Sequence, residues 1–263
     1  MAIELNTIYN EDCLETMKRM PDNFVDLVVT SPPYDNLRTY NGSLVWSEMI
    51  WKNILTELFR VTKEGGVVVW VVGDATIKGS ETGTSSKQAL WAIECGFNLH
   101  DTMIWHKLAK FPHHENSKRY KQQFEYMFVL SKGFVKTYNP IYDVPNKSAG
   151  KNFTIKTKKK SHDNDVPNGK TKNIKIAKYR MRDNVWAISQ TGLDGHPAPF
   201  PEQLAHDHII SWSNEGDIVY DPFMGSGTTA VASKELNRNY IGSEISKEYC
   251  DIAEKRLAQE VLL

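Results

Sequence analysis

The stretch Val25-Asp26-Leu27-Val28-Val29-Thr30-Ser31-Pro32-Pro33-Tyr34 decides how this chain folds. It begins with a short, mostly apolar run of the kind that forms a buried parallel strand. Two consecutive prolines then end the strand, because each lacks an N–H group and has a fixed φ angle. The end of the strand becomes a rigid ledge with a hydroxyl group, carbonyl oxygens and an aromatic ring. The ledge suits a planar ligand that carries an amino group, although a strand that simply ends in a Pro-Pro turn is the alternative.

A second stretch, Asp221-Pro222-Phe223-Met224-Gly225-Ser226-Gly227-Thr228-Thr229, lies between an expected strand at residues 217–221 and an expected helix at residues 228–236. Gly225 and Gly227 allow the backbone to approach a ligand closely and to adopt positive φ. The next expected strand, residues 240–243, ends at Glu244, which suits an acid that accepts hydrogen bonds from two ribose hydroxyls. No lysine follows the glycines as in a phosphate-binding loop. The pattern therefore favours an adenosine ligand without phosphates.

Together the two stretches resemble the paired motifs of the DNA amino-methyltransferases. That family carries a catalytic S/D/N-P-P-Y motif and an S-adenosylmethionine loop of the form D-P-F-x-G-S-G-T-T. The catalytic motif comes first here, which is the circularly permuted order of the family's β group. The resemblance implies an α/β fold with a Rossmann-like methyltransferase sheet, S-adenosylmethionine as cofactor and double-stranded DNA as partner. It implies that the target base is held by Ser31, Pro32, Pro33 and Tyr34, and the cofactor by Asp12, Asp221, Pro222, Phe223, Gly225, Gly227, Thr228 and Glu244.

Asp12 has a competing role. It follows a short expected strand, in a position where the resembling family has an acid near the adenine and ribose of the cofactor. It also directly precedes an expected helix, where an aspartate is a preferred N-cap. The two roles are compatible.

The remaining pattern predicts alternating strands and helices, and hence a parallel sheet with right-handed crossovers. We expect a helix around residues 51–58 that ends at Gly65-Gly66, a mobile loop at residues 77–86, and a helix at residues 87–94. Further strands are expected at residues 67–72, 102–107 and 125–130. A helix after Pro201 is expected to carry His206 and His208 on its surface. The last helix is expected to bury a stripe of Ile245, Tyr249, Ile252, Ala253 and Leu257.

Length and composition fit one α/β domain with an insertion, since the chain has 263 residues and is 40% hydrophobic. We find no apolar run long enough to span a bilayer and no signal segment, so we expect a cytoplasmic protein of a bacterium, archaeon or phage. Cys13, Cys95 and Cys250 lack the spacing of a disulfide framework or zinc site, and none follows a proline as in C5-cytosine methyltransferases. The adjacent His113-His114 has no third ligand at useful spacing, so no metal is expected.

The net charge of zero conceals an asymmetry. Residues 136–182 hold thirteen Lys or Arg and three Asp or Glu, a net charge of +10, so the rest of the chain carries −10. Such a segment is commonly a solvated, disordered loop. Beside the two motifs it instead favours a target-recognition insertion in a catalytic domain of residues 1–135 and 183–263. The residues predicted to contact DNA are Lys156, Lys158, Lys159, Lys160 and Arg38.

The resemblance predicts methylation of a flipped base at an exocyclic amine. Ser31 before Pro-Pro-Tyr, and the similarity of Leu37-Arg38-x-Tyr40 to cytosine enzymes, favour N4 of cytosine, with N6 of adenine as the alternative. A methyltransferase for RNA or for a protein glutamine, and a non-catalytic DNA-binding module, are further alternatives. A restriction endonuclease counterpart and the choice between monomer and homodimer stay open.

Overall fold

The computed structural model describes residues 2–33, 46–108, 118–156, 171–189 and 201–259. The chain divides into two compact units: unit 1 comprises Met1–Asn139 and Asn184–Leu263, and unit 2 comprises Pro140–Asp183. Within the described ranges, no helix is both long enough and apolar enough to cross a membrane.

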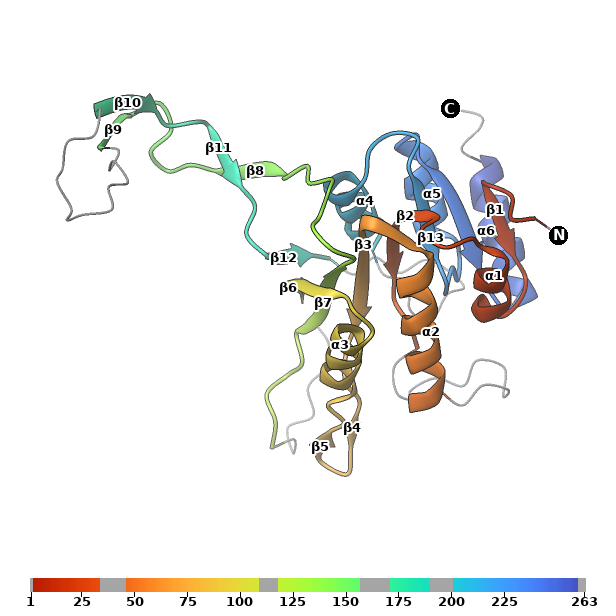
Figure 1. Cartoon of the computed structure of the whole chain (residues 1–263). Coiled ribbons are helices and arrows are strands. Elements are labelled where there is room, and N and C mark those ends of the chain that lie inside the picture. Colours follow the sequence, from red (N-terminus) through yellow and green to blue (C-terminus); the bar gives the residue numbers. More distant parts are fainter. Residues whose placement is uncertain (1, 34–45, 109–117, 157–170, 190–200, 260–263) are drawn as a thin grey trace, which may run out of the picture. The chain divides into compact units, whose positions relative to one another are not determined.

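Unit 1 is built on a mixed sheet of eight strands, in the order β1-β14-β13-β2-β3-β7-β6-β12 (Figure 1). In that order the strands are β1 (Thr7–Tyr9), β14 (Asn239–Ser243), β13 (Ile218–Asp221), β2 (Val25–Thr30), β3 (Thr62–Val72), β7 (Phe124–Ser131), β6 (Asn98–Lys107) and β12 (Val185–Ile188). All neighbours are parallel except β7, which is antiparallel to β3 and β6. The parallel sheet expected from the sequence therefore has one reversed strand, β7, which an antiparallel connection from β6 allows without a crossover.

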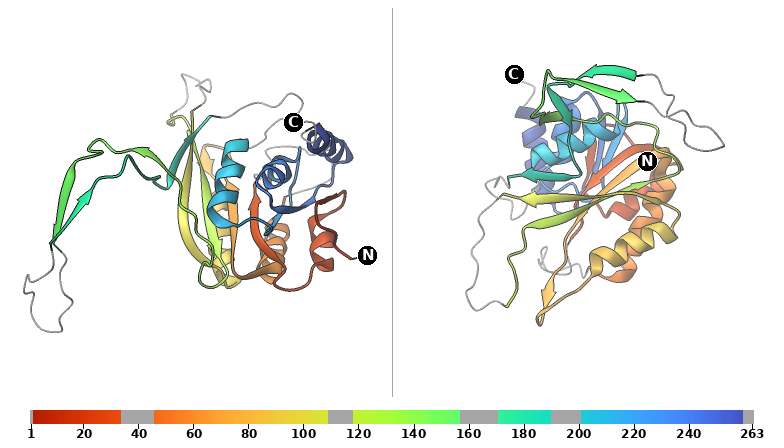
Figure 2. Two further views of the ribbon diagram at one scale, coloured as in Figure 1. Left: turned by 90° about the horizontal axis from the view of Figure 1, so that it is seen from above. Right: turned by 90° about the vertical axis from the view of Figure 1, so that its left-hand side faces the viewer.

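Helices cover both faces of the sheet, as the two views in Figure 2 show. They are α1 (Cys13–Arg19), α2 (Glu48–Val61), α3 (Thr84–Glu94), α4 (Glu202–Trp212), α5 (Thr228–Glu235) and α6 (Lys247–Gln259). Side chains of α1, α2 and α3 share one hydrophobic cluster with the sheet, and those of α4 and α5 share another. Leu257 of α6 packs with residues of α5 and β14. Unit 1 is thus a three-layer α/β/α structure.

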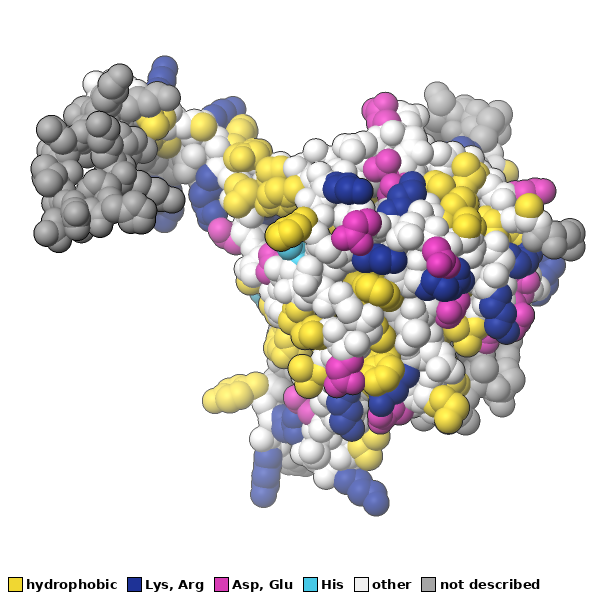
Figure 3. All heavy atoms as spheres, in the orientation of Figure 1, with side chains coloured by type: hydrophobic (Ala, Val, Ile, Leu, Met, Phe, Trp, Pro, Cys, Tyr) yellow, Lys and Arg dark blue, Asp and Glu magenta, His cyan; other side chains and the backbone are white. Residues whose placement is uncertain are grey.

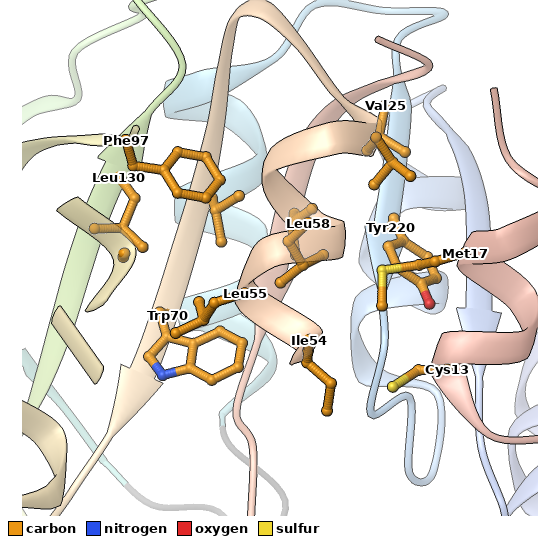
Figure 4. Packing of buried hydrophobic residues seen from close by; sticks show 14 of the residues in the cluster. Cys13, Met17, Val25, Ile54, Leu55, Leu58, Trp70, Phe97, Leu130 and Tyr220 are labelled. Carbon is orange, nitrogen blue, oxygen red and sulfur yellow. The ribbon is translucent and has the colours of Figure 1, made fainter. Parts of the chain in front are cut away.

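Helix α2 forms because its apolar residues recur at helical spacing and face the sheet. Figure 4 shows Ile54, Leu55 and Leu58 of α2 between Trp70 on β3 and Tyr220 on β13. These side chains are almost completely buried, and burying one large apolar side chain stabilises a fold by about 1.5–3 kcal/mol. The indole N–H of Trp70 donates to Oε1 of Gln88 at 2.8 Å, so this polar atom is also satisfied.

The prediction that Gly65-Gly66 ends the helix was wrong. Helix α2 ends at Val61, before the glycines, because Thr62 already has an extended backbone and donates its hydroxyl to the Leu58 carbonyl at 2.6 Å. Gly66 lies inside β3, where a Cβ atom would come within 2.8 Å of the Asp26 carbonyl.

The expected loop at residues 77–86 contains a small hairpin. It consists of β4 (Thr76–Ile77) and β5 (Ser80–Glu81) and is followed by α3 from Thr84. Lys78 and Gly79, which join the two strands, both have positive φ. A two-residue connection of this kind matches the twist of a hairpin.

The described residues of unit 2 form two antiparallel ribbons joined by turns. One ribbon pairs β8 (Tyr142–Pro145) with β11 (Tyr179–Met181), and the other pairs β9 (Asn152–Lys156) with β10 (Thr171–Lys175). Arg182 and Asp143 form an ion pair in unit 2. Hydrophobic and basic side chains lie next to one another on the part of this unit that Figure 3 colours.

Candidate functional site

The two sequence motifs begin at the ends of neighbouring strands. Strands β13 and β2 are neighbours in the sheet. From β13 the chain crosses through α5 to β14, and from β2 it crosses through α2 to β3, which lies in the opposite direction along the sheet. In open α/β sheets, ligands bind outside the carboxyl ends of the strands at such a switch point. Thr30 is the last residue of β2 and Asp221 the last of β13, so the catalytic and cofactor motifs both start there.

The Asp221 carboxylate joins the two motifs. Its Oδ1 accepts hydrogen bonds from the Thr30 hydroxyl at 2.6 Å and from the Phe223 N–H at 2.9 Å, and its Oδ2 accepts one from the Thr229 hydroxyl at 2.7 Å. Burial raises the pKa of this carboxyl group from 3.8 to about 6 in spite of the three donors. Asp221 therefore fixes the end of β2 to the glycine loop and to the first turn of α5. Its contact with a cofactor stays a prediction.

The ledge that follows Thr30 is partly covered. Pro32 is buried, and Ser31 and Pro33 are half-buried. The Thr30 side chain is held by Asp221, so the first residues of the ledge have a fixed position relative to the glycine loop. Tyr34 and Arg38 lie outside the described residues, and their roles stay predictions.

Glu244 lies across the glycine loop at the end of β14. Its Oε2 accepts from the Gly225 N–H at 2.9 Å and its Oε1 from the Ser246 N–H at 2.8 Å. Burial raises the pKa of this carboxyl group. An ionised carboxylate has about four lone-pair sites, so these two hydrogen bonds do not use its full acceptor capacity. The position and unused acceptor capacity fit an acid that binds two adjacent hydroxyl groups.

The two glycines of the loop have different reasons to be glycine. Both have positive φ, 52° at Gly225 and 87° at Gly227. A Cβ atom on Gly227 would lie 2.7 Å from the Ala253 Cβ. Gly227 is therefore required for α5 to begin against α6, whether or not a ligand is bound. At Gly225 only the positive φ favours glycine, and its backbone N–H donates to Glu244.

Other residues assigned to the cofactor surround this loop. Pro222 and Thr228 are buried, and Phe223 is half-buried. The Phe223 ring lies edge-on to Trp46 and Trp70, at centroid distances of 5.6 and 6.3 Å. At the neighbouring strand β1, the Asp12 carboxylate accepts the Leu14 N–H at 2.8 Å. Asp12 is thus the N-cap of α1, and its role at the cofactor stays a prediction.

Arg256 is a residue of this site that the sequence reasoning missed. Its Nη1 donates to the Ser226 carbonyl at 2.7 Å, and its Nη2 donates to Oε1 of Glu202 at 2.6 Å. The guanidinium group therefore ties the glycine loop to α6 and to the start of α4. No motif marks Arg256. Its only sequence signal is its place one helical turn after Ala253, the residue that contacts Gly227.

The prediction that His208 is a surface residue was wrong. Its ring is fully buried and stacks on Trp186 at 4.5 Å, and the indole N–H of Trp212 donates to its Nδ1 at 3.3 Å. Apolar side chains of α4 on either side of His208 pack against the sheet. Ile245 also differs from its prediction, because it is exposed rather than part of the buried stripe of α6.

Thiol and metal chemistry find no support in the described parts of the chain. Burial raises the pKa of the Cys13 thiol, and it raises that of Cys250 to about 11, so both thiols stay protonated near neutral pH. In these same ranges, no group of three or more His, Cys, Asp or Glu is arranged to hold a metal ion. His113 and His114 lie outside them, as do Lys158, Lys159 and Lys160, while Lys156 ends β9.

Comparison with known proteins identifies the family. The family model described as DNA methylase, for N6 and N4 methyltransferases, matches residues 25–255. The chain belongs to the N6/N4 DNA methylase family. It is 52% identical over 251 residues to the orphan methyltransferase M.BamHII of Bacillus amyloliquefaciens, with 92% of each chain covered. It is 34% identical to the type II methyltransferase M.BglII of Bacillus subtilis, over 97% of this chain and 70% of that protein.

Solved structures show the same fold. The PvuII DNA methyltransferase, described as cytosine-N4-specific, superposes with a TM-score of 0.71 at 21% identity and covers 97% of this chain and 87% of its own. The complex of M1.HpyAVI with S-adenosylmethionine superposes with a TM-score of 0.61 at 24% identity, over 95% and 98% of the two chains. The mixed α/β sheet of this N6/N4 DNA methylase is therefore the methyltransferase sheet that the sequence predicted.

As a member of this family, the protein is an S-adenosylmethionine-dependent DNA methyltransferase. Its residues fit that cofactor. The switch point offers a buried carboxylate with unused lone pairs, Glu244, and a backbone loop that Asp221 and Arg256 hold in place. No lysine stands after Gly227 to neutralise a phosphate. When bound, S-adenosylmethionine supplies an electrophilic methyl group.

Proposed function

We propose that this enzyme methylates N4 of a cytosine that has been flipped out of double-stranded DNA. The observation that carries the proposal is Ser31, which stands before Pro32-Pro33 at the end of β2, the strand end that Asp221 fixes to the glycine loop. In the family that the sequence resembles, serine in this position accompanies cytosine targets more often than adenine targets. A hydroxyl both donates and accepts, which matches a base with an NH2 group beside a ring-nitrogen acceptor. Adenine has the same pair of groups, so N6-adenine methylation is the alternative.

The ledge acts by orientation and electrostatics. The exocyclic nitrogen of cytosine is a poor nucleophile because its lone pair is delocalised into the ring. Acceptors at the Ser31 hydroxyl and the Pro32 carbonyl draw the NH2 hydrogens and thereby localise that pair, and Tyr34 stacks on the ring. Bound S-adenosylmethionine would supply an electrophilic methyl group, and Ser31 and the Pro32 carbonyl would hold the attacking amino nitrogen, which gives up one proton as it is methylated.

The base must leave the duplex before it can reach this ledge. We assign the contact with the rest of the DNA to the basic segment at residues 136–182, which largely coincides with unit 2. Its charge of +10 supports this assignment, because neutralisation of phosphates dominates binding to DNA. The descriptions of M.BamHII and M.BglII as methyltransferases support methyl transfer as the reaction. Since M.BamHII is described as an orphan, the proposal does not require a restriction endonuclease partner.

The test is nucleoside mass spectrometry of duplex DNA treated with the purified enzyme and S-adenosylmethionine, followed by sequencing that maps the modified positions. We expect N4-methylcytosine within one short recognition sequence. A Ser31→Ala variant should lose most of the transfer while it still binds the cofactor, because we assign Ser31 to the base and Glu244 to the cofactor. N6-methyladenine without N4-methylcytosine would contradict the choice of base. Preferential methylation of RNA or of protein glutamine in parallel reactions would contradict the choice of duplex DNA.

A further inference from the structure

The β9–β10 ribbon of unit 2 has two chemically different faces. Its antiparallel register places Phe153 opposite Ile174 and Thr154 opposite Asn173. Since successive side chains of a strand point to opposite faces, the first pair lies on one face and the second on the other. The pair Asn152 and Lys175 shares the polar face, and all six side chains are exposed.

The polar face carries an amide that is already oriented. The Thr154 hydroxyl donates to Oδ1 of Asn173 at 2.8 Å across the ribbon. This hydrogen bond fixes the amide plane and leaves the two Nδ2 hydrogens and one Oδ1 lone pair for a ligand. One donor beside one acceptor is the pattern that pairs with N7 and the N6 amino group of adenine in the major groove.

The apolar face is the competing surface. Phe153 and Ile174 are 58% and 40% exposed. They can contact only a thymine methyl group among the base edges of the major groove, whereas every base pair presents hydrogen-bonding groups there. An asparagine amide on the outer side of a bound ribbon would contribute nothing to that recognition. The chemistry of base edges therefore favours the polar face.

We propose that the β9–β10 ribbon enters the major groove with its polar face toward the bases, and that Asn173 reads a purine of the recognition sequence, adenine by its pattern of donor and acceptor. The inference rests on the proposed function, methylation of duplex DNA. It adds the residue that determines specificity. The major groove, about 12 Å wide, admits a two-stranded β-ribbon. Charge complementarity supports this occupant, since unit 2 holds twelve Lys or Arg and four Asp, a net charge of +8.

The experiment compares the full-length enzyme with Asn173→Ala on a duplex library randomised around the modified site, with sequencing of the methylated positions. Discrimination at one base pair should fall by about tenfold or more, while the other positions keep their preference. Thr154→Val removes the orienting hydroxyl and leaves Asn173 in place, so it should relax the same position to a smaller extent. Ile174→Ala is the matched control on the opposite face and should leave the recognition sequence unchanged. Thermal unfolding of each variant confirms that it is folded.

Two results overturn the inference alone. One is an unchanged recognition sequence for Asn173→Ala, with methylation slower at every sequence alike. Asn173 would then contact the sugar-phosphate backbone of the DNA and not a base. The other is relaxation by Ile174→Ala and not by Asn173→Ala, which would turn the apolar face toward the bases. If Asn173→Ala does not fold, Thr154→Val decides between these outcomes by the same readout. Absence of methyl transfer to any duplex by the wild-type enzyme overturns the proposed function, and the inference with it.

Discussion

Glu244 and Asp221 are two buried carboxylates at one edge of the sheet, and their partners give them different roles. Asp221 accepts three hydrogen bonds from protein groups, two of them from the hydroxyls of Thr30 and Thr229. Glu244 accepts backbone N–H groups on both of its oxygens. Asp221 is therefore a positioning residue for both motifs, whereas Glu244 is held by backbone N–H groups, one of them from the glycine loop.

Glu244→Ala should weaken the binding of S-adenosylmethionine by about 1.5–3 kcal/mol. The variant lacks the charged carboxylate that we expect to accept hydrogen bonds from the ribose hydroxyls. Isothermal titration calorimetry measures this difference. Glu254→Ala, which removes the same charge from an exposed position of α6, is the matched control and should bind as the wild type does. Unchanged affinity in a folded Glu244→Ala variant would remove Glu244 from the cofactor site.

Asp221 should make stability depend on pH in an unusual direction. Its pKa in the folded protein, about 6, exceeds the ordinary value of 3.8, so the folded state binds more protons than the unfolded state between these values. The contribution of the protonated carboxyl group is fully present below pH 3.8 and is lost as the pH rises through about 6. Relative to Asp221→Asn, the wild type should lose about 3 kcal/mol of unfolding free energy over this interval.

Urea denaturation of both proteins between pH 4 and pH 7 measures that difference. Asp251→Asn, at a solvent-exposed ion pair on α6, is the control for the removal of one aspartate and should show no comparable trend against the wild type. A difference between the wild type and Asp221→Asn that stays constant with pH would contradict the prediction.

At the scale of secondary structure, the packing of α5 against α6 depends on Gly227. Gly227→Ala should destabilise the protein by about 1–2 kcal/mol for the left-handed backbone conformation and by about 1–3 kcal/mol more for overpacking against Ala253. Gly79→Ala is the matched control, because Gly79 also has positive φ, 82°, but nothing lies within 4 Å of its added Cβ. It should cost only the conformational part. Denaturant unfolding compares the two, and equal losses would show that α6 moves aside without cost.

The strands at the switch point were predictable because each is an apolar run ended by proline or by a charged residue. Such a run needs no information from distant residues. The end of α2 was not predictable in this way, because Thr62 starts a strand before the glycines that normally end a helix. His208 was misplaced for a related reason. Histidine is usually half-exposed, and only the arrangement of β7, β12 and α4 encloses it among Met127, Trp186 and Trp212.

Over the whole molecule, the sequence predicted which motifs meet but not how they are joined. The order of the catalytic and cofactor motifs, together with Glu244 at the end of the following strand, indicated the methyltransferase sheet. The hydrogen bond between Thr30 and Asp221 spans 191 residues, and Arg256 reaches the Ser226 carbonyl from 30 residues away. No local pattern encodes such contacts. They follow from the packing of strands and helices that the sequence specifies separately.

The distribution of charge over the whole molecule leads to a final prediction. Residues 136–182 carry +10 and the rest of the chain −10, so we expect the attraction to DNA to come from one segment of an otherwise acidic protein. Replacing Lys158, Lys159 and Lys160 by glutamine should weaken binding to every DNA sequence alike, because phosphate contacts carry no sequence information. The slope of log affinity against log salt should become shallower by about 0.9 for each phosphate that the variant no longer neutralises.

Fluorescence anisotropy with duplex DNA at several salt concentrations measures this slope. The control replaces three lysines outside the segment by glutamine, at Lys18, Lys247 and Lys255. It should leave the slope unchanged. An equal slope for the wild type and the segment variant would show that these three lysines face solvent in the complex.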